Sequence, residues 1–131
     1  MQKKRAWIYV RQRGPEKEMR AQIEDLRAVA AENDFEVVDV SSDHVDGTVV
    51  RRPGLRRMMA YISRHDIETV ITTRLTGISR NRKVMIEVLN ELQRRHVKLL
   101  TVYSQLEYDR ELYNIGASLL SSADHDGFTV W

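Results

Sequence analysis

The chain has no cysteine among its 131 residues, so it can form neither a disulfide framework nor a thiolate metal site. This absence agrees with a cytoplasmic location, which we predict for the protein. The sequence also lacks a long hydrophobic run. The apolar segment behind the basic residues 3–5 ends at Arg11, which is too short for a signal-peptide core or a membrane span. The length fits one globular domain with its own core.

A strong excess of positive charge is missing as well. The chain has 21 lysine and arginine residues and 19 acidic residues. The resulting net charge of +2 does not by itself indicate nucleic-acid binding. The arginines are nevertheless clustered, as Arg51–Arg52, Arg56–Arg57, Arg94–Arg95 and the group Arg80, Arg82 and Lys83. Two interpretations are open: a solvated basic face, or a surface that binds phosphate.

The few glycines and prolines separate segments of two alternating kinds. Short apolar runs predict strands at residues 6–10, 35–40, 68–73 and 97–102. Apolar residues at helical spacing predict helices at 16–33, from 53 and from about 81, and a weaker stripe at Leu112, Ile115 and Leu119. Residues 41–52 are predicted to form an irregular loop. The alternation predicts an α/β fold with a mainly parallel sheet of four or five strands flanked by helices.

Arginines follow three of the predicted strands, at positions where a parallel sheet would bring them to one edge. These candidates for binding an anion are Arg11, Arg13, Arg52 and Arg80. Their planar forks suit a phosphate, and with no acid expected nearby they would repel one another unless an anion lay between them. The four histidines have no metal-like spacing, so we expect no metal and no cofactor.

Four motifs carry a resemblance to a known family, namely Tyr9–Arg11, Gln22 with Leu26, Asp43 with Gly47 ahead of Arg52–Leu55, and Arg74–Asn81. Over residues 6–120 the chain resembles the catalytic domain of serine recombinases, the resolvases and invertases. The resemblance implies a resolvase-like fold of three layers, assigned to residues 1–123, with residues 124–131 as a tail. It also implies that a serine attacks the DNA backbone, arginines stabilise the transferring phosphoryl group, and strands are exchanged within a tetramer.

The chain departs from the family pattern at the reacting positions. The resemblance places Arg13 where the family has its nucleophilic serine, and Thr76 and Gly77 where it has an aspartate and an arginine. A protonated guanidinium has no lone pair with which to attack. The resemblance therefore leaves no intact catalytic residue, while Arg11, Arg52 and Arg80 keep matching positions.

Three serines are candidate substitutes for the missing nucleophile: Ser41, Ser42 and Ser79. Ser79 matches a family position that is not the nucleophile, and a polar loop or a helix cap explains it more simply. We expect none of the three to replace the missing hydroxyl.

The expected function is that of a catalytically inactive binding or regulatory module. It would contact DNA phosphate through Arg11, Arg52 and Arg80, helped by Arg13, or pair with a recombinase or a second copy of itself. Because the chain ends without the long helix and separate DNA-binding domain of the family, we do not expect sequence-specific binding. Two alternatives are an active recombinase fragment with an unrecognised nucleophile, and a protein-interaction domain with no DNA role. No membrane or small-molecule cofactor is expected as a partner.

Overall fold

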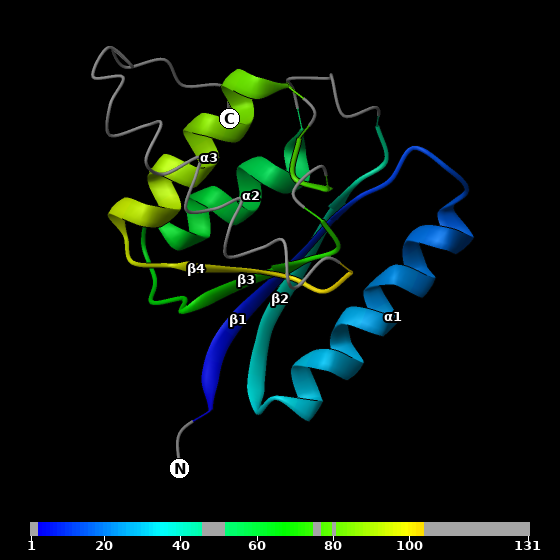
Figure 1. The fold of residues 1–131 in the computed structure, drawn as a ribbon, viewed down its shortest axis with the longest axis horizontal. Coiled ribbons are helices and arrows are strands. Elements are labelled where there is room, and N and C mark those ends of the chain that lie inside the picture. The colour runs from blue at the N-terminus through cyan, green and yellow to red at the C-terminus, as the bar shows by residue number, and fades with distance from the viewer. Residues whose placement is uncertain (1–2, 46–51, 75–76, 80, 104–131) are drawn as a thin grey trace.

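The computed structural model describes residues 3–45, 52–74, 77–79 and 81–103, which form seven helices and strands in alternation. In chain order they are β1 (Lys4–Arg11), α1 (Glu16–Glu32), β2 (Phe35–Asp43), α2 (Pro53–Ile62), β3 (Thr69–Thr72), α3 (Arg82–Arg94) and β4 (Lys98–Thr101). The strands pair in parallel in the order β2-β1-β3-β4. The predicted α/β fold with a parallel sheet is thus confirmed, with four strands in the described part of the chain (Figure 1).

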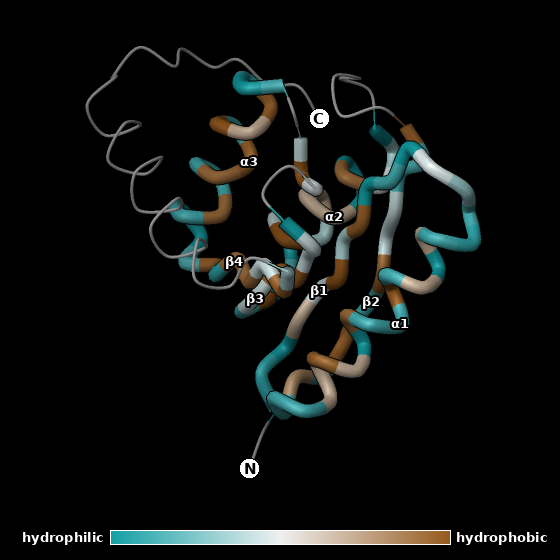
Figure 2. The backbone as a smooth tube through the Cα atoms, turned by 45° about the vertical axis from the view of Figure 1, so that its right-hand side comes forward, coloured by the Kyte–Doolittle hydropathy of each residue, from teal (hydrophilic) through white to brown (hydrophobic). Residues whose placement is uncertain are grey.

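The domain has three layers, with α2 and α3 on one face of the sheet and α1 on the other, so β1 is buried on both faces. Residues Ala6 to Val10 are at most 1% exposed, which explains why they read as one continuous apolar run. Trp7 and Tyr9 pack into the cluster that α2 and α3 cover, whereas Ala6, Ile8 and Val10 pack against α1 on the other face. Figure 2 shows the hydrophobic segments concentrated in the strands and along the sheet-facing sides of the helices.

The helices begin where the sequence places a terminating or capping residue. Pro53 opens α2 at its first position, where the missing N–H loses no hydrogen bond. Asn81 caps α3, because its side-chain oxygen accepts from the backbone N–H of Lys83 at 3.0 Å and of Val84 at 3.2 Å. None of the described helices has the length and apolar character that a membrane span needs.

The prediction of an irregular loop beginning at residue 41 is wrong for its first three residues. β2 continues to Asp43, and Ser41 to Asp43 pair with Tyr9 to Arg11 of β1. Serine and aspartate are poor strand formers, but here Ser41 and Asp43 make buried side-chain hydrogen bonds that hold them in the sheet. The helical pattern at 112–119, the tail at 124–131 and any fifth strand in those segments lie outside the described residues.

Candidate functional site

The carboxyl ends of β1 and β2 form a common edge at which α2 begins. Arg11 is paired in register with Asp43, and the backbone N–H of Gln12 donates to Asp43 O at 3.1 Å. From β1 the chain passes outward to β2 and then returns to β3 on the other side of β1. The edge beyond β1 and β3 is therefore the topological switch point, where open α/β sheets bind ligands.

Asp43 is the centre of a buried hydrogen-bond network at this edge. Its Oδ1 accepts from Gly54 N at 2.8 Å, and its Oδ2 accepts from Leu55 N at 2.9 Å and from the Tyr9 hydroxyl at 2.6 Å. Arg52, which holds the N-cap position of α2, makes no side-chain cap hydrogen bond. Asp43 therefore caps α2 from a neighbouring strand and places a negative charge at its positive end.

Arg52 lies inside the same network. Its Nε and Nη2 donate to the Tyr9 hydroxyl at 3.2 and 2.9 Å, and its Nε is 4.0 Å from Asp43 Oδ2, with the Arg52 side chain 0% exposed. The expectation that no acid lies near the candidate arginines is thus wrong for Arg52. The remaining nitrogen, Nη1, is buried and has no hydrogen-bond partner among the described residues. A buried donor of this kind calls for a partner such as an anion or a water molecule.

Tyr9 carries its hydroxyl between the arginine and the carboxylate. Burial raises the pKa of Tyr9 well above its ordinary range, and the hydrogen bond to Asp43 raises it further, against the lowering effect of the Arg52 charge. Tyr9 is therefore neutral, donating to Asp43 and accepting from Arg52. The sequence signal for this role was weak, because Tyr9 sits within an apolar strand and reads as core.

The raised pKa of Tyr9 predicts a loss of stability in alkali. Because folding favours the protonated hydroxyl, the stabilising contribution is complete below pH of about 10 and is lost as the pH rises above that value. The free energy of unfolding should then fall by up to about 1.4 kcal/mol per pH unit for this group. Urea unfolding of the wild type and of Tyr9→Phe, between neutral and alkaline pH, measures the effect. Equal pH dependence in both proteins would contradict the prediction.

The other predicted site residues are distributed differently. Arg11 is half-buried and its Nη1 donates to Val45 O at 3.4 Å, and Arg13 is exposed in the loop behind β1. Arg52 therefore lies beside the Asp43 carboxylate, whereas Arg11 is the neighbour of Asp43 in the strand register. Arg80 and Thr76 lie outside the described residues, so the predicted convergence of all four arginines stays a prediction. Among the described residues no group of three histidines or acids is arranged to hold a metal ion.

Two of the three candidate substitute nucleophiles, Ser41 and Ser79, are buried and hydrogen-bonded. Ser41 is 4% exposed, accepts from Trp7 Nε1 at 2.9 Å and donates to Gly54 O at 2.8 Å. Ser79 is 2% exposed, and its Oγ accepts from Asn81 N at 2.9 Å in the loop ahead of α3. Ser42 is half-buried, and strand alternation directs it to the face opposite Ser41.

Gly77 is packed against the end of β3. A Cβ atom at this position would lie 2.8 Å from Thr73 Oγ1 and 3.1 Å from Thr72 Oγ1. A larger side chain, such as the arginine that the resemblance implies for the family, therefore requires the loop or the threonines to shift. The departure at residue 77 fits the local packing of this chain.

Comparison with known protein families gives one match to nearly the whole chain. The family described as "Resolvase, N terminal domain" matches residues 6–123. Two curated relatives from Staphylococcus aureus are similar. The transposon Tn552 DNA-invertase BinR is 30% identical over 78 residues, which are 60% of this chain and 40% of that protein. The transposon Tn552 resolvase is 30% identical over 71 residues, which are 54% of this chain and 35% of that protein. The matched region thus spans well under half the length of either relative.

Solved structures of low sequence identity share the fold. The N-terminal catalytic domain of TP901-1 integrase superposes with a TM-score of 0.76 at 18% identity, covering 94% of this chain and 99% of that one. The C-terminal catalytic domain of ISC1926 TnpA, an IS607-like serine recombinase, gives 0.71 at 22% identity, covering 91% and 82%. A resolvase family site-specific recombinase from Streptococcus pneumoniae gives 0.69 at 20% identity, covering 93% and 89%.

Proposed function

We propose that this chain, a member of the family described as "Resolvase, N terminal domain", is a catalytically inactive serine recombinase domain that acts as a phosphate-binding module. The observation that carries the proposal is Arg13. It stands where the resemblance calls for the attacking serine. It is exposed in the loop that follows β1, at the carboxyl ends of the strands, where open α/β sheets generally bind ligands. A permanently charged guanidinium cannot form a phosphoserine link.

The other hydroxyl groups that could replace the missing serine support the loss of the covalent step. The hydroxyls of Ser41 and Ser79 are buried in hydrogen bonds, and Tyr9 is buried and held neutral between Asp43 and Arg52. A nucleophile needs access to the phosphorus atom and a base to accept its proton. Each missing group of this kind raises a barrier by several kcal/mol, about tenfold in rate per 1.4 kcal/mol.

The binding part of the proposal rests on the arginines that remain. Arg11 ends β1 and Arg13 lies in the loop that follows it. At the start of α2, Arg52 offers a buried Nη1 that has no hydrogen-bond partner among the described residues. Because Asp43 already balances the charge of Arg52, the outer contacts to an anion come from Arg11 and Arg13, with Arg80 proposed as a further contact. The phosphate is assigned to DNA because the two curated relatives are named a DNA-invertase and a resolvase.

Incubation of the protein with supercoiled plasmid tests both parts of this proposal. We expect neither nicking nor a covalent protein–DNA adduct, but retention of the protein on DNA at low salt. In Arg11→Gln/Arg13→Gln the slope of log K against log salt concentration should fall by about 2, since each lost phosphate contact removes about 0.9. Arg20→Gln/Arg27→Gln, which removes two charges from the exposed face of α1, is the matched control.

Two results would reject parts of the proposal in favour of the alternatives. An adduct that disappears in Ser42→Ala or in Ser79→Ala would identify an active recombinase. DNA retention that is equal in the wild type and in Arg11→Gln/Arg13→Gln would remove the phosphate contact and leave a protein-interaction domain.

A further inference from the structure

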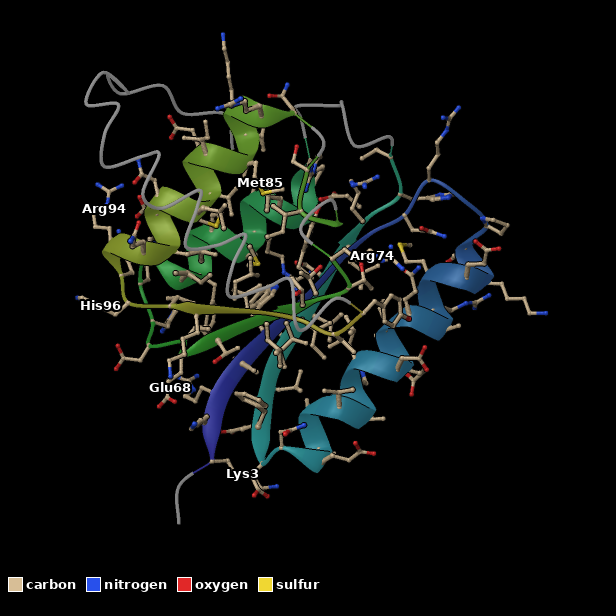
Figure 3. All side chains as sticks on the ribbon, in the orientation of Figure 1. Lys3, Glu68, Arg74, Met85, Arg94 and His96 are labelled. Carbon is tan, nitrogen blue, oxygen red and sulfur yellow. The ribbon has the colours of Figure 1, made fainter. Side chains whose placement is uncertain are left out.

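A polar hollow lies at the amino ends of β3 and β4, at the opposite end of the strands from the Asp43 network. It is formed where α2 and α3 end and β3 begins, and it encloses about 380 Å³. Its polar lining residues are Ser63, Arg64, His65, Asp66, Arg94 and Arg95. In Figure 3, Arg94 lies at the end of α3, whereas Arg74 marks the carboxyl end of β3 on the other side of the molecule.

Positive charge exceeds negative charge around this hollow. Arg94 and Arg95 both pair with one carboxylate, that of Glu91, and the distance from Arg95 Nε to Glu91 Oε1 is 2.6 Å. The side chain of Arg64 makes no hydrogen bond or ion pair with the described residues. Three guanidinium groups, those of Arg64, Arg94 and Arg95, thus lie near two acids, Asp66 in the lining and Glu91, and among the described residues only Glu91 pairs with any of them. The Arg94 side chain is 72% exposed, so a ligand can reach it without any rearrangement of the protein.

The walls of the hollow are held in place before any ligand arrives. Arg95 is fixed at two points, because its Nη1 also donates to Ser63 O at 3.3 Å. On the other side the His65 ring stacks on Tyr61 with the centroids 4.3 Å apart, and the Tyr61 hydroxyl accepts from Arg5 Nη2 at 3.0 Å. A guanidinium fork that is already oriented loses less entropy when it binds an oxyanion.

We propose that this hollow is a second anion site. It binds a phosphate group through Arg64 and Arg94, and Arg95, which is already held in place, provides the third positive charge. Its volume lies in the range of small-ligand pockets, about 300–1,000 Å³, so it can admit a diphosphate or a segment of nucleic-acid backbone. The site is independent of the carboxyl-edge proposal, since it shares no residue with it. Together the two edges would let one domain contact two phosphate-bearing segments.

The test is a titration of the full chain, followed by amide NMR, with inorganic pyrophosphate in one arm and a short DNA duplex in the other. We expect the amides of residues 63–67 and 94–97 to shift in the pyrophosphate arm. Arg64→Gln/Arg94→Gln should weaken this binding by roughly tenfold, the effect of losing charge-assisted hydrogen bonds. Arg20→Gln/Arg27→Gln loses the same charge from α1 and should change the affinity less than about twofold.

The duplex arm separates the two sources of phosphate. Shifts at the same amides with both probes assign nucleic acid, and shifts with pyrophosphate alone assign a free phosphate compound; either result supports the site. Equal weakening by the two double variants would overturn it, because the effect would then be general charge. The absence of shifts at 63–67 and 94–97 would also overturn it. Those arginines would then serve only to complement the carbonyl ends of α2 and α3.

Discussion

Replacing Asp43 by alanine is expected to destabilise the domain by about 3–5 kcal/mol, the range for breaking a buried ion pair on one side. The change removes the acceptor of Gly54 N, Leu55 N and the Tyr9 hydroxyl, so the start of α2 loses its cap. It also leaves the fully buried guanidinium of Arg52 without the carboxylate 4.0 Å away. Urea unfolding at neutral pH, followed by far-UV circular dichroism, measures the loss.

A second ion pair on the surface provides the matched control. Asp39 pairs with Arg57, and the two side chains are 47% and 55% exposed. Because exposed pairs contribute only about 0–1 kcal/mol, Asp39→Ala should shift the unfolding free energy by less than about 1 kcal/mol. If Asp43→Ala and Asp39→Ala lose the same amount, the buried network does not stabilise the fold as described.

The double variant Asp43→Ala/Arg52→Met separates the two sources of the loss. Methionine at position 52 removes the uncompensated charge but does not restore the cap of α2. The double variant should therefore recover only part of the stability lost in Asp43→Ala. The recovered part measures the buried charge, and the remainder, about 1–2 kcal/mol, measures the cap. A double variant less stable than Asp43→Ala would show that the unpaired charge of Arg52 is not the main cause of the stability lost in Asp43→Ala.

The helices and central strand of this domain were predictable because their signals are local. The apolar run of β1, the stripe of α1 and the proline that begins α2 each depend on neighbouring residues only. The family resemblance also rests on short motifs whose spacing survives in the sequence. These features predict the order of the helices and strands. From that order it follows that the candidate arginines lie at the carboxyl ends of the strands.

The Asp43 network was not predictable in the same way, because it depends on contacts between distant segments. Asp43 reads as a loop residue until β2 is paired with β1, and only then does its carboxylate meet the start of α2. Arg52 reads as exposed, since arginine is almost never fully buried without a partner. Its partners, Tyr9 and Asp43, lie on two other elements. Pairwise geometry, not composition, decides which of the arginines stay at the surface.

The strand order was open for a related reason. Alternation of strands and helices requires parallel crossovers but does not say on which side of β1 the next strand lies. The observed order places β2 on one side of β1 and β3 on the other. That arrangement places Arg11, at the end of β1, and Arg13, in the loop that follows, at the switch point of the sheet.

Replacing Gly54 by alanine is expected to destabilise the domain by about 2 kcal/mol or more, as overpacking against backbone does. A Cβ atom at residue 54 would lie 2.4 Å from Ser42 O and 3.0 Å from Asp43 Oδ2, so α2 must move away from β2. That movement would also lengthen the hydrogen bonds that Asp43 makes to the start of α2. Thermal and urea unfolding measure the change.

The direction of this effect is informative because helix propensity alone predicts the opposite. Alanine is favoured over glycine inside a helix by about 1 kcal/mol, so Gly54→Ala would be stabilising if the space were free. Gly14→Ala is the matched control, since its Cβ would meet only Glu18 Oε2 at 2.8 Å and Gln12 Nε2 at 3.1 Å, the ends of two flexible side chains. We expect Gly14→Ala to change the unfolding free energy by less than about 1 kcal/mol. A Gly54→Ala protein as stable as the wild type would mean that α2 does not rest against the backbone of β2, and the capping role of Asp43 would then lose its geometric basis.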